Sequence, residues 1–323
     1  MKTTNCLREK PGSRLKVHAA SRLTIMARTF LLGLLISFMA FPQFVHAAPA
    51  ISEKNIRLDL PGKNNFKIVV VNDSHIAEES DEIRKEKRDY VRARVEHFRL
   101  VSGSRSTDTW NRILGKLDGY HADLIVFAGD MVDYYSRRNY SILRNGLKKL
   151  KTPYIYLRAN HDRKKGYTGK SRRNVKKQGK KLGDDNPVIV RNYRRFVVVG
   201  INDSTSNLTR EGYLVLRDVW NMNKPVILFT HVPFESHIDS RLTEKSKTAW
   251  KGRVYLWSDR DTYYRKTKYT IKFLKMLYAK KSPVKAVIAG HLHFSDTSKL
   301  TKNTTQYVLD ASYRGNVGIV RIS

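Results

Sequence analysis

The sequence has few acidic residues, a single cysteine and no hydrophobic run long enough to cross a membrane. Of its 323 residues, 29 are Asp or Glu and 62 are Lys or Arg, which gives a formal net charge of +33. The lone cysteine, Cys6, excludes an intramolecular disulfide. The longest apolar run, from Phe30 to Phe41, is shorter than the ~20 residues that a spanning helix needs.

The N-terminal region has the pattern of a secretory signal peptide, which we predict over residues 1–47. Basic residues Arg22 and Arg28 precede the apolar run, and the small residues of "VHAAPA" follow it, which places cleavage after Ala47. An uncleaved anchor is the alternative, and Met26 is a second candidate start. We therefore expect a secreted, periplasmic or cell-envelope protein without a stable membrane span after cleavage.

Cleavage would leave a strongly basic protein without thiol chemistry. It removes Cys6, seven basic residues and one acidic residue, so the formal net charge falls from +33 to +27 and a cysteine nucleophile is excluded. Such a surface attracts polyanions, among them nucleic acid, anionic lipid, cell-wall phosphate and phosphorylated substrates. A generally basic proteome explains the same charge equally well. Stability outside the cytoplasm then has to come from packing or from bound metal.

Two segments stand out by composition, and each has two interpretations. Residues 163–181 hold ten basic residues and no acidic one, which predicts a solvated loop or an insertion. Residues 240–268 mix basic residues with aromatic rings. These rings either stack on a substrate or form the core of a capping subdomain.

Strand-like and helix-like segments alternate along the rest of the chain, which predicts an α/β layered fold in one domain over residues 65–323, after a linker at 48–64. The C-terminal stretch reads as two closing strands around a glycine turn. The expected strands lie at 66–71, 123–128, 154–158, 196–201, 226–230 and 286–289, and the expected helices at 82–101, 107–117, 137–150 and 269–280.

Five of the expected strands are each followed at once by His, Asp or Asn. Ligands of open α/β sheets bind beyond the carboxyl ends of the strands, so these side chains can converge although they span 220 positions. A polar residue after a single strand is usually an ordinary surface or core residue, whereas chance is a poor explanation for five strands that all end this way. Asp133 and Asp162 either belong to the site or only orient neighbours and cap helices. The residues are Asp73 and His75, Asp130 and Asp133, Asn160, His161 and Asp162, His231, and His291 and His293.

This set of donors indicates a particular class of metal. Imidazole and carboxylate ligands without thiolates suit Mn, Fe or Zn, whereas Mg and Ca prefer shells made only of oxygen. The donors are too many for one four-coordinate ion, and a carboxylate can bridge two ions. Two ions roughly 3.5–4 Å apart stabilise the attacking and leaving oxygens of an in-line displacement. We therefore expect two divalent metal ions.

The order of these motifs resembles that of the calcineurin-like metallophosphoesterase superfamily, from about Phe66 to the C-terminus. In this chain they read Asp73-Ser-His75, Gly129-Asp130-Met-Val-Asp133, Asn160-His161-Asp162, Thr-His231 and Gly290-His291-Leu-His293. The resemblance implies a two-layer β-sandwich flanked by α-helices, a four-layer αββα arrangement, with a dinuclear metal site at the C-terminal ends of strands.

The resemblance also implies a role for each residue. Asp130 would bridge both ions, and a hydroxide that they share would attack phosphorus. His161 would donate a proton to the leaving oxygen, and Asp162 would orient His161 and keep it protonated. The remaining ligands would be Asp73, His75 and His293 for the first ion and Asn160, His231 and His291 for the second.

The chain departs from the family pattern at two places. Ala159 precedes Asn160 where the family usually has Gly, so this position needs either positive φ, which strains Ala, or only a small side chain. We favour the second explanation. The segment between His75 and Gly129 is long, and we expect a helical insertion that covers part of the rim of the site.

These observations favour a secreted metal-dependent phosphoesterase that hydrolyses a phosphomonoester or a phosphodiester. The alternative is a polyanion-binding protein of the cell envelope whose metal centre is structural or vestigial. The expected partner is a phosphorylated substrate, with a polyanion or nucleic acid among the options. The sequence leaves the substrate, the metal and the oligomeric state open.

Overall fold

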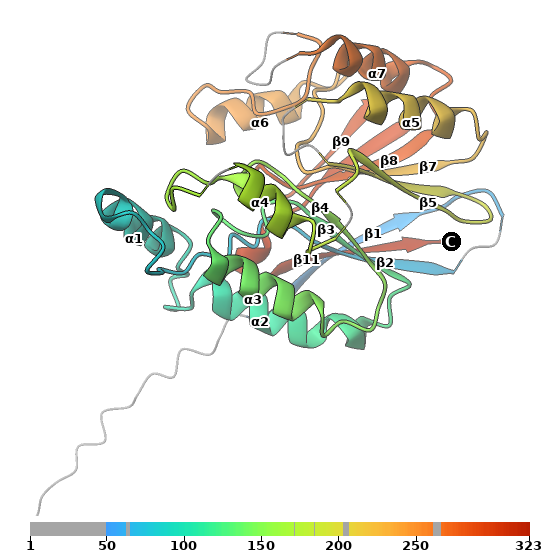
Figure 1. The fold of residues 1–323 in the computed structure, drawn as a ribbon. Helices are drawn as coiled ribbons and strands as arrows, with labels where there is room; N and C mark the ends of the chain where they lie inside the picture. The colour runs from blue at the N-terminus through green and yellow to red at the C-terminus, as the bar shows by residue number, and fades with distance from the viewer. Residues whose placement is uncertain (1–49, 63–64, 171, 184, 203–206, 261–265) are drawn as a thin grey trace, which may run out of the picture. The chain divides into compact units, whose positions relative to one another are not determined.

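The computed structural model describes residues 50–62, 65–170, 172–183, 185–202, 207–260 and 266–323. The expected signal peptide over residues 1–47 lies outside these ranges. Among the described helices, none combines the length and the apolar character that crossing a membrane requires. Two β-sheets form the centre of this part of the chain, and helices cover their outer faces (Figure 1).

The first sheet has five strands in the order β1-β11-β2-β3-β4. Strands β2, β3 and β4 run parallel, whereas β11 pairs antiparallel with β2 and parallel with β1. The runs of Val, Ile and Leu in β2 and β3 suit strands that are buried on both faces. The strands are β1 (Ser52–Leu58), β2 (Phe66–Val71), β3 (Leu124–Ala128), β4 (Tyr154–Leu157) and β11 (Asn316–Ile322).

The second sheet has six strands in the order β5-β6-β7-β8-β10-β9. Its four central strands run parallel, and the two edge strands β5 and β9 are antiparallel to their neighbours. The strands are β5 (Val188–Asn192), β6 (Val197–Ile201), β7 (Val226–Phe229), β8 (Val284–Ala289), β9 (Asp296–Thr301) and β10 (Thr304–Val308).

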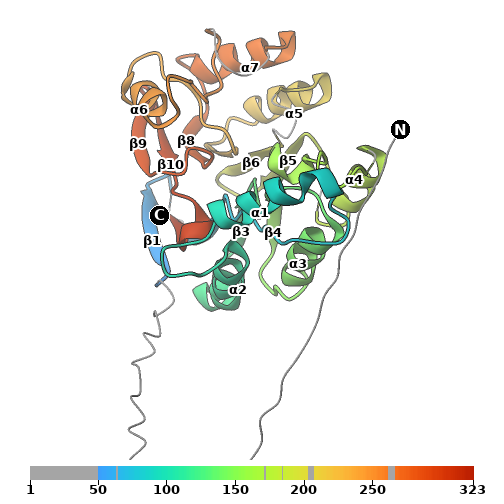
Figure 2. The ribbon, with the colours of Figure 1, turned by 90° about the vertical axis from the view of Figure 1, so that its left-hand side faces the viewer.

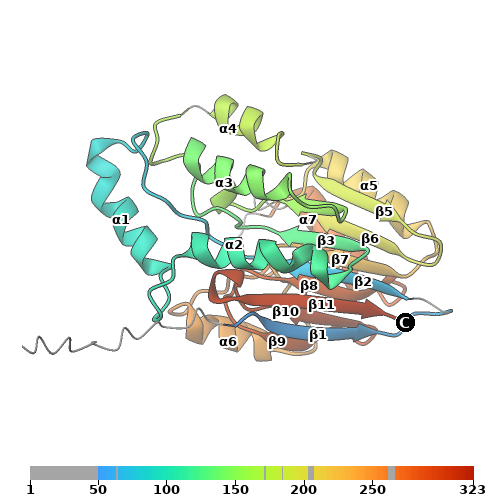
Figure 3. The ribbon, with the colours of Figure 1, turned by 90° about the horizontal axis from the view of Figure 1, so that it is seen from below.

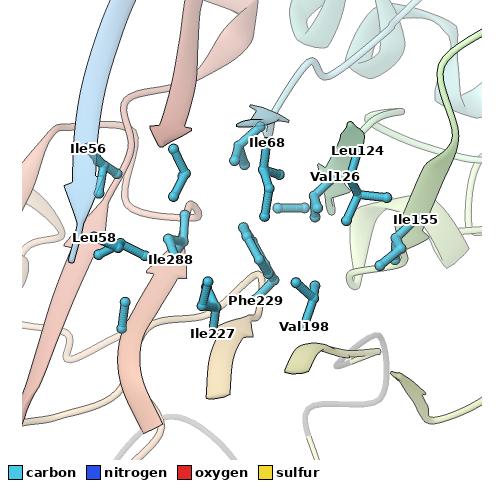
Figure 4. Packing of buried hydrophobic residues seen from close by; sticks show 14 of the residues in the cluster. Ile56, Leu58, Ile68, Leu124, Val126, Ile155, Val198, Ile227, Phe229 and Ile288 are labelled. Carbon is cyan, nitrogen blue, oxygen red and sulfur yellow. The ribbon is translucent and has the colours of Figure 1, made fainter. Parts of the chain in front are cut away.

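The two sheets pack face to face through an apolar layer. Ile68 and Val126 of the first sheet meet Ile227 and Phe229 of the second in one buried cluster (Figure 4). Full burial of a side chain of this size contributes about 1.5–3 kcal/mol to stability. Separate apolar clusters fill the space between each sheet and its own helices. The structure therefore confirms the predicted sandwich of two mixed sheets between helical layers.

Two pairs of helices cover the outer faces. Helices α2 (Ser106–Leu117) and α3 (Arg137–Leu147) lie on the first sheet, as the view in Figure 3 shows. Helices α5 (Arg210–Trp220) and α7 (Lys268–Tyr278) lie on the second. Several helices begin at a hydroxyl that accepts a backbone N–H; the caps are Ser136 for α3, Thr209 for α5 and Thr267 for α7.

Two further helices lie toward the end of the sheets at which the parallel strands finish (Figures 1 and 2). Helix α1 (Arg88–His97) follows the 3₁₀ turn η1 (Lys85–Lys87) in the segment between β2 and β3, and α6 (Arg241–Ala249) follows β7. The remaining short elements are η2 (Asp118–Tyr120), η3 (His161–Arg163), α4 (Arg172–Gly179) and η4 (Ser312–Arg314).

The structure differs from the sequence-based expectations in four places. Strand β1 lies inside the segment expected to be a linker and pairs with β11. The helix expected over 82–101 is confined to η1 and α1. The basic segment 163–181, expected to be a loop or an insertion, contains α4, whose Val175 is buried against the first sheet's outer cluster. Elements β5, β9, α5 and α6 were not expected as separate elements.

Candidate metal centre

The loops that follow β2 and β3 run side by side and are joined by backbone hydrogen bonds. The N–H of Asp73 donates to the carbonyl of Gly129 at 3.0 Å, and the N–H of His75 donates to the carbonyl of Asp130 at 3.0 Å. Parallel neighbours in one sheet end at the same edge, so the two Asp-containing motifs face each other there. This pairing brings Asp73, His75 and Asp130 into one buried region.

The backbone at these donors is strained. Asp73, His75, Asp130, His291 and His293 have φ angles of 48°, 42°, 50°, 70° and 56°, in the left-handed region that residues with a Cβ seldom adopt. Each such residue costs on the order of 1–3 kcal/mol and persists only where the surrounding structure enforces it. Five donors of one site share this conformation, which indicates that it serves the site and not the fold alone.

The second sheet contributes imidazoles to the same place. His231 follows β7, and its Nδ1 lies 2.9 Å from the carbonyl of Ala128 at the end of β3. That contact directs Nε2 toward Asp130, whose Oδ2 is 3.1 Å away. His291 follows β8, and its backbone N–H donates to Asp73 Oδ2 at 2.8 Å. All three contacts cross from one sheet to the other.

Glycine is required where the sheets approach most closely. Gly129 has a φ of +90°, and a Cβ at this position would lie 2.8 Å from the His231 ring and 2.9 Å from the Cβ of Ala159. Ala159 is buried and is absent from the residues with positive φ. The position before Asn160 therefore needs a small side chain and not a left-handed backbone, as we favoured from the sequence.

Six of the donors form two neighbouring groups of three, and each group contains one Asp. Asp73, His75 and His293 place a ligand atom each within 4.8 Å of one another, and so do Asp130, His231 and His291. A third group of the same kind, His75, Asp130 and His161, overlaps both. Asn160 lines the cavity that these residues open into, without a measured contact to either group. The geometry thus brings six of the seven predicted ligands into two groups, and places the seventh, Asn160, in the lining of the adjoining cavity.

The electrostatics of this region favour a cation. Burial acts against ionisation, but the neighbouring imidazoles, His231 foremost, hold the pKa of Asp73 well below its usual range. Burial lowers the pKa of His75, yet hydrogen bonds to Asp133 and Asp73 raise it overall to about 9. Burial and the nearby His231 lower the pKa of His291 to about 3, which leaves that imidazole neutral with a lone pair to donate.

The arrangement of the imidazole nitrogens fits a pair of transition-metal ions. Nε2 of His75 lies 3.1 Å from Nε2 of His293, and Nδ1 of His291 lies 3.2 Å from Nε2 of His231. Two imidazole nitrogens that bind the same ion at the Zn–N distance of about 2.0–2.1 Å are roughly 3.0–3.4 Å apart at the usual N–metal–N angles. In addition, the buried Oδ1 of Asp73 has no hydrogen-bond partner among the described residues. Nitrogen and carboxylate donors without thiolate suit Mn, Fe or Zn.

His161 is held by Asp133 and not by Asp162. Nδ1 of His161 lies 2.9 Å from Oδ1 of Asp133 and 2.8 Å from its backbone carbonyl, so this nitrogen carries the proton. Nε2 is then the ring nitrogen left for a substrate. The carboxylate of Asp133 is itself gripped by Arg94 of α1, through Nε at 2.9 Å and Nη2 at 2.5 Å.

Asp162 has a structural role that corrects the one expected from the sequence. Its carboxylate accepts four backbone N–H groups at 2.9–3.1 Å; the donors are Ala159, Asp130, Met131 and Val132. Asp162 therefore fixes the Asp130 loop to the end of β4. Its oxygens are taken up by backbone donors, and Nδ1 of His161 contacts Asp133, so the orienting role falls to Asp133.

Two residues of the site were missed by the sequence analysis: Arg94 in α1, and Phe98 directly after that helix. Besides Arg94, Phe98 stacks on His75 with ring centroids 4.2 Å apart and an interplanar angle of 10°. Their four-residue spacing on an expected helix was visible, but nothing in the sequence connected that helix to the site. Its position confirms that the insertion between His75 and Gly129 covers part of the rim.

These side chains open into a cavity of about 860 Å³. The candidate donors form one side of the cavity, and residues from α1, from the segment after β4 and from the segment after α6 form the rest. The lining residues are His75, Tyr90, Arg94, His97, Phe98, Asp130, Asn160, His161, Lys164, Trp250, Arg253, Tyr255, His291 and His293.

The fold and this donor set define the class of metal-dependent phosphoesterases built on a two-sheet sandwich. A family model described as calcineurin-like phosphoesterase matches residues 66–295, and the chain belongs to that family. No curated protein matches the sequence. The family membership confirms the resemblance found in the motifs.

Several solved structures are similar to this chain at low sequence identity. They include a dimetal phosphatase from Danio rerio (TM-score 0.48, 14% identity, 77% of this chain and 88% of that one). A purple acid phosphatase from yellow lupin, Lupinus luteus, has a TM-score of 0.45 and 13% identity over 77% of this chain and 44% of that one. A phosphopantetheinyl hydrolase from Mycobacterium tuberculosis has a TM-score of 0.40 and 12% identity over 77% and 91%.

Proposed function

We propose that the protein is a secreted phosphoesterase that hydrolyses a phosphomonoester or phosphodiester with the help of two divalent metal ions. The observation that carries this proposal is the pair of donor groups around Asp130, within reach of a His161 ring whose Nδ1 is fixed. The residues fit two ions: Asp73, His75 and His293 would hold one, Asn160, His231 and His291 the other, and Asp130 would bridge them.

The ions would supply Lewis acidity and an activated water-derived nucleophile at neutral pH. The chain's own groups do the rest. His161, with Nδ1 bound to Asp133, holds its other nitrogen ready to donate a proton to the departing ester oxygen, typically worth ~10²–10⁴-fold in rate. Arg94 fixes Asp133, and the buried strand-end loops keep the donors in place, so little reorganisation accompanies the reaction.

Hydrolysis of para-nitrophenyl phosphate and of its bis ester tests the proposal. Purified protein should release nitrophenol with Mn, Fe or Zn present, and a chelator should abolish the release. The ratio of the monoester rate to the diester rate then assigns the reaction within the class. Absence of turnover from protein shown to hold metal would support the polyanion-binding alternative, in which the metal centre is structural.

Export and the nature of the partner belong to the same proposal. The basic residues, the apolar run and the small residues before Ala47 support cleavage after that residue. The charge of +27 that would remain supports a phosphorylated or polyanionic partner. Mass spectrometry of the protein from the cell envelope or medium should find Ala48 at the N-terminus, whereas a retained residue 1–47 segment would indicate an anchor.

A further inference from the structure

The cavity is far larger than a phosphate group requires. Its volume of about 860 Å³ lies in the upper part of the ~300–1,000 Å³ range of pockets that enclose whole small-molecule ligands. The candidate ligands occupy only one side. The remaining surface is therefore available to the part of the substrate that the phosphate is attached to.

One wall of the cavity is aromatic and lies against the candidate ligands. Trp250 and Tyr255 pack edge to face with centroids 5.6 Å apart. The Trp250 ring is 5.9 Å from the ring of His293, and the Tyr255 ring is 5.8 Å from that of His291. Both rings are half-buried, because their inner sides join an apolar cluster with Leu256 while the cavity reaches the rest. Trp250 and Tyr255 therefore belong to an apolar core on one side and line the cavity on the other.

The charge beyond the donors is positive. Arg253 lies between the two rings in sequence, is exposed, and donates from Nη1 to the Tyr255 hydroxyl at 3.1 Å. Lys164 lines the cavity next to His161. The only carboxylate among the described lining residues is Asp130, which belongs to the donor set.

We propose that the cavity takes a nucleotide unit: its base stacks against the Trp250–Tyr255 wall, its reacting phosphate faces the donor set, and a second anionic group faces Arg253. The proposal rests on the proposed function and names its substrate class. A purine or pyrimidine supplies the planar π-face that such rings bind without regard to sequence. Its sugar spans the short distance between the imidazoles and the wall. A guanidinium at the rim recognises a further phosphate.

The experiment compares substrates that share one scissile bond. Adenosine 5′-monophosphate and ribose 5-phosphate break the same primary ester, so their difference in kcat/KM measures the base. The wild-type enzyme with Mn should favour the nucleotide by roughly 10-fold or more. Trp250→Leu and Tyr255→Leu should each bring the ratio toward 1, whereas Tyr269→Leu, a half-buried ring outside the cavity, should leave it unchanged.

A second arm tests Arg253 and the origin of the unit. Adenosine 3′,5′-bisphosphate should be preferred to the 5′-monophosphate by the wild type but not by Arg253→Gln. A short single-stranded oligonucleotide then separates a free nucleotide from a unit within a strand. Quenching of tryptophan fluorescence by adenosine, lost in Trp250→Leu, reports stacking without turnover.

The outcomes separate the two proposals. If wild-type kcat/KM is equal for the two 5′-phosphates, the nucleotide assignment is wrong while the phosphoesterase assignment stands. If neither para-nitrophenyl ester is hydrolysed by metal-loaded protein, the proposed function itself fails. Should Trp250→Leu not fold, the exposed Arg253→Gln and the half-buried Tyr255→Leu decide the matter.

Discussion

The two sheets contribute chemically different halves of the candidate site. The loops after β2, β3 and β4 supply all of its carboxylates, including Asp73, Asp130 and Asp133, together with two of its imidazoles. The loops after β7 and β8 supply imidazoles only: His231, His291 and His293. One sheet therefore brings the negative charge, and the other brings imidazole nitrogens that can ligate an ion.

The ties between the halves differ as well. Within the first sheet, Asp162 and backbone bonds between adjacent loops fix the acidic residues. Between the sheets, polar contacts include His231 to the Ala128 carbonyl and the backbone N–H of His291 to Asp73. A cation that binds donors from both halves would thus stabilise the packing of one sheet on the other. It would also offset the negative charge of the buried carboxylates in the first half.

Loss of Asp130 should have the largest effect, because its carboxylate lies between the two halves. Oδ2 is 3.1 Å from His231 Nε2, and Oδ1 accepts the backbone N–H of His161 at 3.1 Å. Asp130→Ala should reduce bound metal and lower kcat/KM by on the order of 10³-fold or more, as loss of several kcal/mol of transition-state stabilisation requires. Elemental analysis and steady-state kinetics measure both. Asp123→Ala, at the other end of β3, is the control, and full metal content in Asp130→Ala would contradict the assignment.

Loss of the His161 ring should separate turnover from metal binding. The ring belongs to the first half but is bound through Asp133, so His161→Ala should keep its metal and lose ~10²–10⁴-fold in kcat. His121→Ala, an exposed histidine before β3, should match the wild type. Equal loss of metal and activity would make His161 a ligand.

Substitution of Arg94 tests whether Asp133 needs the guanidinium to hold His161 in place. Arg94→Gln should lower kcat by roughly 10–100-fold, the usual range for a residue that orients a catalytic group through a hydrogen bond. Arg94→Lys should recover little of it, because a lysine cannot reproduce two parallel bonds. Arg92→Gln, on the same helix and paired with Asp89, is the control. An unchanged kcat, or full rescue by lysine, would show that Asp133 is held without a bidentate partner.

The smallest expected effect concerns the insertion of the second sheet. Asp239 accepts from Arg241 and from the backbone of Lys299, and these hydrogen bonds, Arg241 first, lower its pKa. Because the folded-state pKa is depressed, the stabilisation is present above the unfolded pKa of about 3.9 and is lost as pH falls through the folded value. Asp239→Asn should cost about 1 kcal/mol at pH 7. Denaturant unfolding at pH 7 and at low pH should show the two proteins converging in acid; a constant difference would assign the effect to packing.

Local signals in the sequence predicted the main strands and the donors, and the sandwich followed from the family resemblance of the motifs. Apolar runs mark β2, β3, β7 and β8, and polar residues directly after them mark the site. Partners that arrive from elsewhere carry no such mark. Arg94 reaches Asp133 from a separate helix, and Asp162 accepts backbone N–H groups of its own loop and of the neighbouring one. Strand β1, largely polar and exposed, gains its definition only from pairing with β11.

The position of β11 bears on when the protein can fold. Residues 316–322 fill the place between β1 and β2, so β1 joins the rest of the first sheet only through this strand. Contacts of such long sequence separation form late, after the entropy of closing the chain has been met. The first sheet, and with it the strand-end loop that carries Asp73 and His75, is therefore complete only after β11 has docked between β1 and β2.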